Sequence, residues 1–257
     1  MNEYNVTIHK GGAIATIEFS SIYGNSMPLG LLKELKDTIH KAASDIDVNV
    51  IVLQSTGRNF CNGAYINELF TLDNEASGKA FFKGFANLIN EMRKCSKLII
   101  GRVHAKSVGG GVGLIAACDY AIALEGADIK LSELGLGIGP FVIGPAVARK
   151  IGESAFSQIA IDSTMWRNGD WARKKGLYAE LHPNEESMNE SVLRLAHTLA
   201  HSNVKAMAEM KKMFWQGTDN WDQLLDDRAA ISGKLIVSDY SKAKINAIKL
   251  KQLEKSN

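Results

Sequence analysis

The chain has 257 residues, of which 46% are hydrophobic and 23% charged, and its formal net charge is +2. This balance is typical of a globular protein with one large core and gives no electrostatic reason to expect nucleic acid as a partner. No uncharged apolar run approaches the ~18 residues that a membrane span needs, and the N-terminus lacks the apolar stretch of a signal peptide. Cys61, Cys95 and Cys118 have neither disulfide nor metal-site spacing. We therefore expect a cytoplasmic protein with reduced cysteines, no bound metal, and no membrane or nucleic-acid partner.

The first part of the chain alternates between strand and helix patterns. Two segments rich in β-branched residues flank Gly11-Gly12 and predict a hairpin. Ser26 and Pro28 are typical of a helix cap and a first turn, and the helix predicted after them runs to about residue 43. Further strands are predicted at VNVIVLQS, LIIGRV and YAIAL, with a helix over 75–95 and another beginning at GLIAAC. This alternation indicates an α/β fold.

After about residue 183 the pattern changes to helices alone. Apolar spacing predicts helices over 185–201, 203–216, 219–236 and 238–253, with no strand between them. We place a domain boundary near His182-Pro183, which divides a core domain (1–183) from a helical C-terminal region (184–257).

The stretch SVGGGVG contains four glycines within five positions, Gly109, Gly110, Gly111 and Gly113. Glycine loses more conformational freedom on folding than any other residue, so the cluster needs a physical reason. One reason is close packing of two backbones. A second is phosphate binding, because Gly111-x-Gly113-x-x-Ala116 formally fits the dinucleotide fingerprint, although no GK[ST] follows. A third is an oxyanion hole, in which bare N–H groups at a helix start hold a carbonyl oxygen that gains negative charge.

A second group of donors for such an oxyanion hole is predicted at RNFCNGAYINEL. This segment follows the strand VIVLQST, contains Gly63-Ala64 and then turns helical. Taken alone it fits an ordinary strand-to-helix loop equally well.

Three segments together resemble the crotonase, or enoyl-CoA hydratase/isomerase, superfamily. FCNGAYINEL is similar to its F-x-x-G-A-D-I motif, and ARKKGLYAELHP to its A-x-x-x-G-L-V segment. KLIIGRVHAKSVGGGVGLIAACDYAIALEGADIKLSELGLGIGP is similar to its long central signature. The resemblance covers nearly the whole chain.

The resemblance implies a crotonase-like spiral of ββα units with a helical C-terminal region that forms trimers, often paired as hexamers. It implies an acyl-CoA substrate, with no cofactor besides the coenzyme A of the substrate itself. Carried over by position, the two oxyanion-hole donors are the N–H groups of Ala64 and Gly110. The other residues expected to contact substrate are Gly63, Tyr65, Ile66, Gly109, Gly111, Gly113 and Phe141.

The acid and base of the family are only partly present. One family glutamate aligns with Glu133, but Gly113 takes the position of the other and Tyr65 that of the family aspartate. Leu131, Leu134 and Leu136 surround Glu133 in sequence, so desolvation is expected to raise its pKa toward neutrality. Taken without the resemblance, Glu133 also fits an acid that stabilises a helix N-terminus.

These features predict an enzyme whose first candidate reaction is enoyl-CoA hydration, with Glu133 as acid and base. Double-bond isomerisation is the alternative that a single carboxylate can perform. An acyl-CoA-binding protein without chemistry, thioester hydrolysis, decarboxylation and a nicotinamide dehydrogenase remain further alternatives. Acyl-chain length is not predicted.

Overall fold

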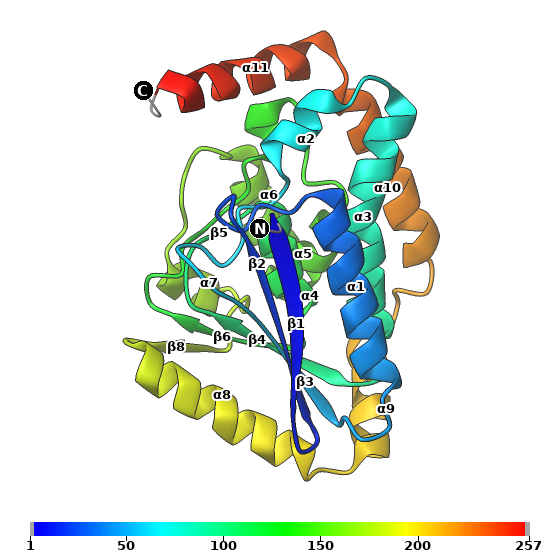
Figure 1. Cartoon of the computed structure of the whole chain (residues 1–257), viewed down its shortest axis with the longest axis vertical. Helices are drawn as coiled ribbons and strands as arrows, with labels where there is room; N and C mark the ends of the chain where they lie inside the picture. The colour runs from blue at the N-terminus through cyan, green and yellow to red at the C-terminus, as the bar shows by residue number, and fades with distance from the viewer. Residues whose placement is uncertain (1–2, 255–257) are drawn as a thin grey trace.

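The N-terminal hairpin forms one edge of the main sheet. The computed structural model describes residues 3–254, and in it β1 (Tyr4–Gly11) pairs antiparallel with β2 (Ile14–Ser21) (Figure 1). Gly12 in the turn has a φ of 61°, which glycine adopts without steric cost. The predicted hairpin is confirmed.

The rest of the main sheet is parallel and grows from β2 in one direction. Its order is β1-β2-β3-β4-β6-β8. The added strands are β3 (Val50–Ser55), β4 (Leu98–Val103), β6 (Tyr120–Leu124) and β8 (Glu180–His182). The strands predicted at VNVIVLQS, LIIGRV and YAIAL are therefore confirmed, whereas β8 escaped the sequence analysis. Together with the helices this gives the predicted α/β class.

Helices cover both faces of the main sheet. On one side α1 (Leu29–Ser44) packs against α3 (Glu75–Lys94), and α10 (Trp221–Ile236) packs along α3. On the other side α8 (Glu185–Ala200) packs against β3, β4 and β6 (Figure 1). With α9 (Val204–Phe214) and α11 (Asp239–Glu254), all four helices predicted after residue 183 are present. The division into domains at residue 183 stays a prediction, and residues 255–257 lie outside the described part.

The start of α1 corrects one detail of the sequence analysis. Ser26 does not cap the helix, and Pro28 occupies the cap position itself. The N–H of Leu29 donates instead to Oε2 of Glu68, which comes from α2 (Ile66–Thr71). A carboxylate at a helix N-terminus satisfies a free donor and interacts favourably with the helix dipole.

A second, smaller ladder of parallel segments accompanies the main sheet. β5 (Ser107–Val108) pairs with β7 (Ile129–Lys130), and single bridges join Cys61 to Ser107 and Met27 to Ala64. In the sequence, each segment of this ladder lies between two strands of the main sheet. Successive stretches of the chain therefore contribute first to the main sheet and then to this ladder. This is the repeating arrangement that the resemblance implied. We call it the short ladder.

The C-terminal ends of the short ladder lead into helices. After β5 comes α4 (Gly110–Ala117), and after β7 comes the single-turn helix η1 (Glu133–Leu136). The helix α4 starts at Gly110, earlier than the predicted start at GLIAAC. Beyond η1 follow α5 (Gly144–Ile151), α6 (Glu153–Ile161) and α7 (Gly169–Lys174).

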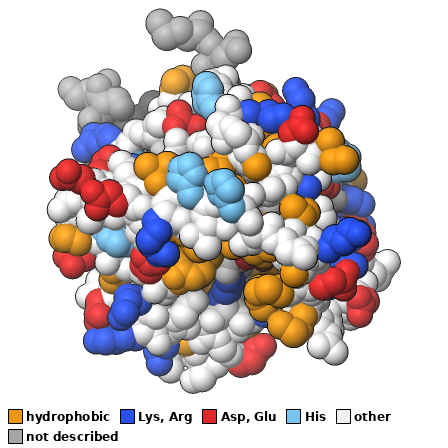
Figure 2. Space-filling model, turned by 90° about the horizontal axis from the view of Figure 1, so that it is seen from below, with side chains coloured by type: hydrophobic (Ala, Val, Ile, Leu, Met, Phe, Trp, Pro, Cys, Tyr) orange, Lys and Arg blue, Asp and Glu red, His pale blue; other side chains and the backbone are white. Residues whose placement is uncertain are grey.

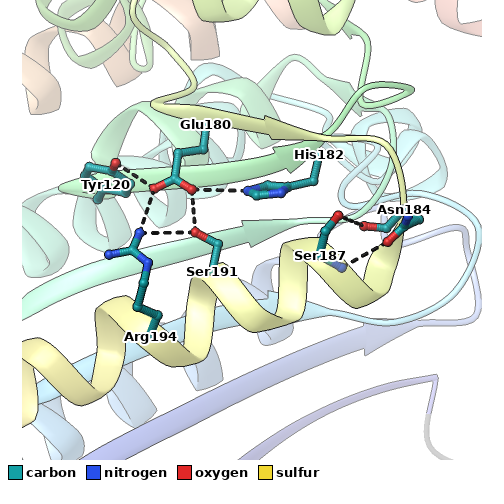
Figure 3. A network of polar contacts seen from close by, with 7 residues as sticks. All are labelled: Tyr120, Glu180, His182, Asn184, Ser187, Ser191 and Arg194. Atoms are coloured by element: carbon teal, nitrogen blue, oxygen red, sulfur yellow. Dashed lines mark hydrogen bonds and ion pairs between the residues drawn. The ribbon is translucent and has the colours of Figure 1, made fainter.

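A polar network fastens α8 to the edge of the main sheet. Glu180 on β8 accepts hydrogen bonds from the hydroxyls of Tyr120 and Ser191 and from Arg194, and its carboxylate contacts His182 (Figure 3). Burial alone would raise the pKa of Glu180, but the bonds from Ser191 and Tyr120 hold it below the ordinary value. At the start of α8, the N–H of Ser187 donates to the Asn184 side chain (Figure 3).

The lower face of the molecule carries acidic, basic and apolar side chains side by side (Figure 2). Cys61, Cys95 and Cys118 are buried free thiols. Within residues 3–254, no helix is long and apolar enough to cross a membrane. Among the side chains that the structure describes, those of residues 3–250, no group of three or more His, Cys, Asp or Glu has metal-binding geometry.

Candidate active site

The backbone N–H of Ala64 points away from Met27, the residue with which Ala64 pairs in the short ladder. The carbonyl of Gly63 accepts from the N–H of Met27 at 2.7 Å, and the N–H of Tyr65 donates to the Met27 carbonyl at 3.3 Å. In a trans peptide the C=O and N–H groups point in opposite directions, so the Ala64 N–H faces away from Met27. Within the described residues it has no backbone acceptor.

The N–H of Gly110 is free for a similar reason. The carbonyl of Gly109 points into α4, where it accepts from the N–H of Val112 at 2.9 Å. The Gly110 N–H therefore points out of the helix N-terminus, and no backbone acceptor meets it in the described chain. A β-carbon on Gly63 would lie 3.2 Å from the Gly110 nitrogen, which places the two donor segments side by side.

Gly109 joins this pair of amides to the carboxyl group of Glu133. Gly109 has a φ of 53° and a ψ of −117°, a conformation that side-chain-bearing residues avoid. A β-carbon there would lie 2.9 Å from Oε1 of Glu133. The absence of a side chain therefore lets the carboxyl group rest directly on the backbone next to Gly110.

Burial sets the protonation of Glu133. Desolvation raises its pKa to about 7, while backbone N–H groups of Glu133 itself and Ser132 oppose the rise. Its Oε2 is buried and has no hydrogen-bond partner in the described part of the structure. A carboxyl group with a pKa near neutrality exchanges a proton readily in both directions, which suits general acid–base chemistry.

A cavity of about 490 Å³ brings these groups together. Its size is in the range of small-molecule binding sites. Seven predicted site residues line it: Gly63, Ala64, Ile66, Gly109, Gly110, Glu133 and Phe141. Phe82 and Phe85 of α3 form part of an apolar wall, and Ile248 of α11 also faces the cavity. In Figure 1, α11 crosses the top of the molecule beside α2, so the last helix helps to enclose the site.

Three predicted site residues do not line this cavity. Gly113 packs against α5, and a β-carbon there would lie 2.5 Å from Cγ2 of Ile143. Gly111 packs against the segment before Ala64, where a β-carbon would lie 2.6 Å from the carbonyl oxygen of Cys61. Tyr65 stacks on Tyr23 with 4.1 Å between ring centroids. These residues shape the walls or the outer surface and do not face the cavity.

Ile143 covers Gly113, the residue that the resemblance aligns with a second family glutamate. The apolar Ile143 side chain itself lines the cavity. Among the described residues that line the cavity, Glu133 is the one carboxylate. The site therefore offers two backbone donors and a single acid.

A family model described as enoyl-CoA hydratase/isomerase matches residues 9–254. The chain belongs to the enoyl-CoA hydratase/isomerase family. The resemblance read from the motifs is thereby confirmed, and acyl-CoA thioesters are the substrates on which this family acts.

Relatives within the enoyl-CoA hydratase/isomerase family carry different activities in their names. The peroxisomal Delta(3,5)-Delta(2,4)-dienoyl-CoA isomerase of Arabidopsis thaliana is 22% identical to this chain. The match covers 89% of this chain and 86% of the length of that isomerase. The probable enoyl-CoA hydratase of Bacillus subtilis is 26% identical over 84% of this chain and 83% of its own length. The crystal structure of an enoyl-CoA hydratase from Bacillus halodurans matches with a TM-score of 0.87 at 20% identity, covering 94% of this chain and 99% of that one. This last likeness shows the crotonase fold.

Several cavity residues of this family member were missed in the sequence. The polar ones are Ser26, Asn62, Lys130, Ser132, Ser163, Thr164 and Ser232. Lys130 and Ser132 alternate with the buried Ile129 and Leu131. This period of two is typical of a strand with one buried face, and it was the available signal. Three further hydroxyl residues lie far away in the sequence, at Ser163, Thr164 and Ser232. No local spacing in the sequence therefore predicts that they line the cavity.

Glu133 should make stability depend on pH. Its pKa is about 7 when folded and 4.5 ordinarily, so the folded state binds more protons between these values and loses stability as pH rises through them. The full loss is about 3 kcal/mol. The Glu133→Gln variant has no such carboxyl group and does not lose this stability. The difference in unfolding free energy, variant minus wild type, should therefore increase by about 3 kcal/mol from pH 4.5 to pH 8. Urea denaturation at both pH values measures this. The exposed Glu125 supplies a control, since Glu125→Gln should change stability equally at both; the same result for Glu133→Gln would contradict the prediction.

Proposed function

We propose that this chain is an enoyl-CoA isomerase that uses Glu133 as its single acid and base. One observation carries the proposal: two free backbone amides and one carboxyl group face the same cavity, and Ile143 covers the position of a second acid. A reaction that moves one proton between two carbons needs one such group, whereas addition of water benefits from two.

The two amides act on the thioester oxygen. When a proton leaves the α-carbon, negative charge moves onto the thioester oxygen, and the N–H groups of Ala64 and Gly110 donate to it. Each well-placed donor typically contributes ~3–4 kcal/mol to the transition state in a site from which water is excluded. Apolar walls, including Phe85 and Leu136, help to exclude water here.

The Glu133 carboxyl group carries the proton. For a 3-enoyl thioester, the ionised Glu133 accepts a proton from C2, so the C2–H bond breaks while a double bond forms between C2 and C3. The former C3–C4 double bond supplies the electron pair for a new C4–H bond, with the proton that Glu133 returns. The product is the conjugated 2-enoyl thioester, and no other reactant is consumed.

Hydration of a 2-enoyl thioester is the second candidate, and it is the reaction that the sequence analysis placed first. The hydroxyls of Ser132, Ser163 and Thr164 line the cavity together with Glu133 and favour it, because they are suited to hold a water molecule. Glu133 would then both activate this water and deliver the α-proton.

Turnover of matched thioesters separates the two candidates. Wild-type protein should convert 3-hexenoyl-CoA into 2-hexenoyl-CoA, and kcat/KM should rise with pH up to about 7 as Glu133 ionises. Glu133→Gln should lower kcat by 10²- to 10⁴-fold, the usual contribution of a general acid–base. Chromatography of the products identifies the reaction. Formation of 3-hydroxyhexanoyl-CoA from 2-hexenoyl-CoA, with no turnover of 3-hexenoyl-CoA, would favour hydration, and full activity of Glu133→Gln would end both mechanisms.

The contact between Gly109 and Glu133 gives an independent test. Gly109→Ala should lower kcat by about 100-fold, because its β-carbon would displace the carboxyl group and strain a backbone that positions the Gly110 amide. Gly126 is the matched control, since a β-carbon there meets nothing within 4 Å. Gly126→Ala should retain wild-type turnover. Equal kcat values for the two variants would contradict the role of Gly109.

We also propose that the chain assembles as a trimer or a pair of trimers in the cytoplasm. Met210, Met213 and Phe214 on α9 are exposed. Exposed apolar groups of this kind mark interaction surfaces. Light scattering should give a mass of three or six times 28.0 kDa. A monomer at all concentrations would contradict the assembly.

A further inference from the structure

Lys130 is a cation in the wall of the cavity that holds Glu133. It belongs to β7, where Ile129 is buried and Lys130 therefore faces the opposite side, toward the cavity. Among the described residues that line the cavity, no other is positively charged. Among the described side chains of residues 3–250, no carboxylate lies within 4.0 Å of the Lys130 Nζ.

An aromatic ring holds the Lys130 ammonium group in place. Its Nζ lies 4.8 Å from the centroid of the Trp166 ring, a favourable cation–π distance. Lys106 contacts the same ring at 4.8 Å, but its charge is paired with Asp128 at 3.2 Å. Of the two cations on this ring, Lys130 is thus the one that faces the cavity and has charge left for a ligand.

Hydroxyl groups accompany this cation on the same side of the cavity. Ser132 is two residues along the chain, and Ser163 and Thr164 come from the segment that leads to Trp166. The rest of the lining is mainly apolar or glycine. One cation with neighbouring hydroxyl donors is suited to a carboxylate or a phosphate oxygen, because hydrogen bonds to ionised acceptors are the strong ones.

The position of Lys130 favours a charge on the acyl group. Glu133 is three positions after Lys130 in the chain, so their Cα atoms are at most about 11 Å apart. The phosphates of coenzyme A lie beyond the whole pantetheine arm, far from the carbon at which Glu133 acts. A carboxylate on a short acyl chain stays near that carbon.

We infer that Lys130 binds a carboxylate carried by the acyl group of the substrate, so that the preferred thioesters are those of short dicarboxylic acids. This inference rests on the proposed acyl-CoA site but not on which reaction follows. Lys130 is then a specificity residue, and the apolar wall around Phe82 and Phe85 contacts the uncharged part of the ligand.

Binding of two unreactive thioesters tests the inference. Pentanoyl-CoA and glutaryl-CoA have five-carbon acyl groups and differ in the terminal carboxylate, so calorimetry compares them without turnover. Glutaryl-CoA should bind wild-type protein about 10- to 100-fold more tightly. Lys130→Met keeps the apolar stem of the side chain and should bring the ratio of the two Kd values close to one. Lys106→Met, which alters the paired cation on the same ring, should leave this ratio at the wild-type value.

Three results would overturn the inference. Equal affinity of wild-type protein for both thioesters would show that the cavity does not recognise the carboxylate. A Lys130→Met variant that weakens both equally and preserves the ratio would assign the cation to a phosphate of coenzyme A. Binding of neither thioester would also end the proposed acyl-CoA function, which distinguishes the two failures.

Discussion

The short ladder is the constraint on which the site depends. Parallel segments place their C-terminal ends at one edge. Three successive segments of this ladder end at Ala64, at Val108 two residues before Gly110, and at Lys130 three residues before Glu133. Backbone pairing within the ladder uses the Gly63 carbonyl and the Tyr65 N–H, which leaves the Ala64 N–H without an acceptor. The donors and the acid therefore meet because main-chain hydrogen bonds align the segments that carry them.

The glycine cluster has a separate steric reason at each position. Side chains at Gly109 and Gly110 would meet Glu133 and Phe85, and side chains at Gly111 and Gly113 would meet Cys61 and Ile143. These neighbours belong to four different segments of the chain. The interpretations as close backbone packing and as an oxyanion hole are thus compatible, since α4 must pack tightly on all sides for its first N–H to reach the cavity.

The longer elements of the fold could be predicted from sequence because their patterns are local. The β-branched run of β3 and the apolar face of α1 each extend over several residues, which gives a detectable period. β5, β7 and β8 have only two or three residues, too few for any period, and their existence depends on pairing with distant segments. The prediction that Ser26 caps α1 was wrong for the same reason. The side chain that accepts from the Leu29 N–H belongs to Glu68, which lies on another helix.

The site was predictable where a motif carried it and not where packing decided it. The raised pKa of Glu133 agrees with the expectation, yet Leu134, one of the leucines on which that expectation rested, is 50% exposed. Tertiary packing, including Gly109 against the carboxyl group, buries Glu133 instead. Lys130 followed a visible alternation and lies within the central signature, but the resemblance assigns no role to its position, so attention to the family pattern alone passed over it.

The close contact between Gly113 and Ile143 also bears on how this site could diversify. A larger residue at position 113 would overpack the helix interface, and a smaller one at position 143 would open a void, so either single replacement costs stability. Only a paired exchange preserves volume. The two positions are therefore epistatic, and an evolutionary path toward two-acid chemistry must cross a less stable intermediate or change both at once.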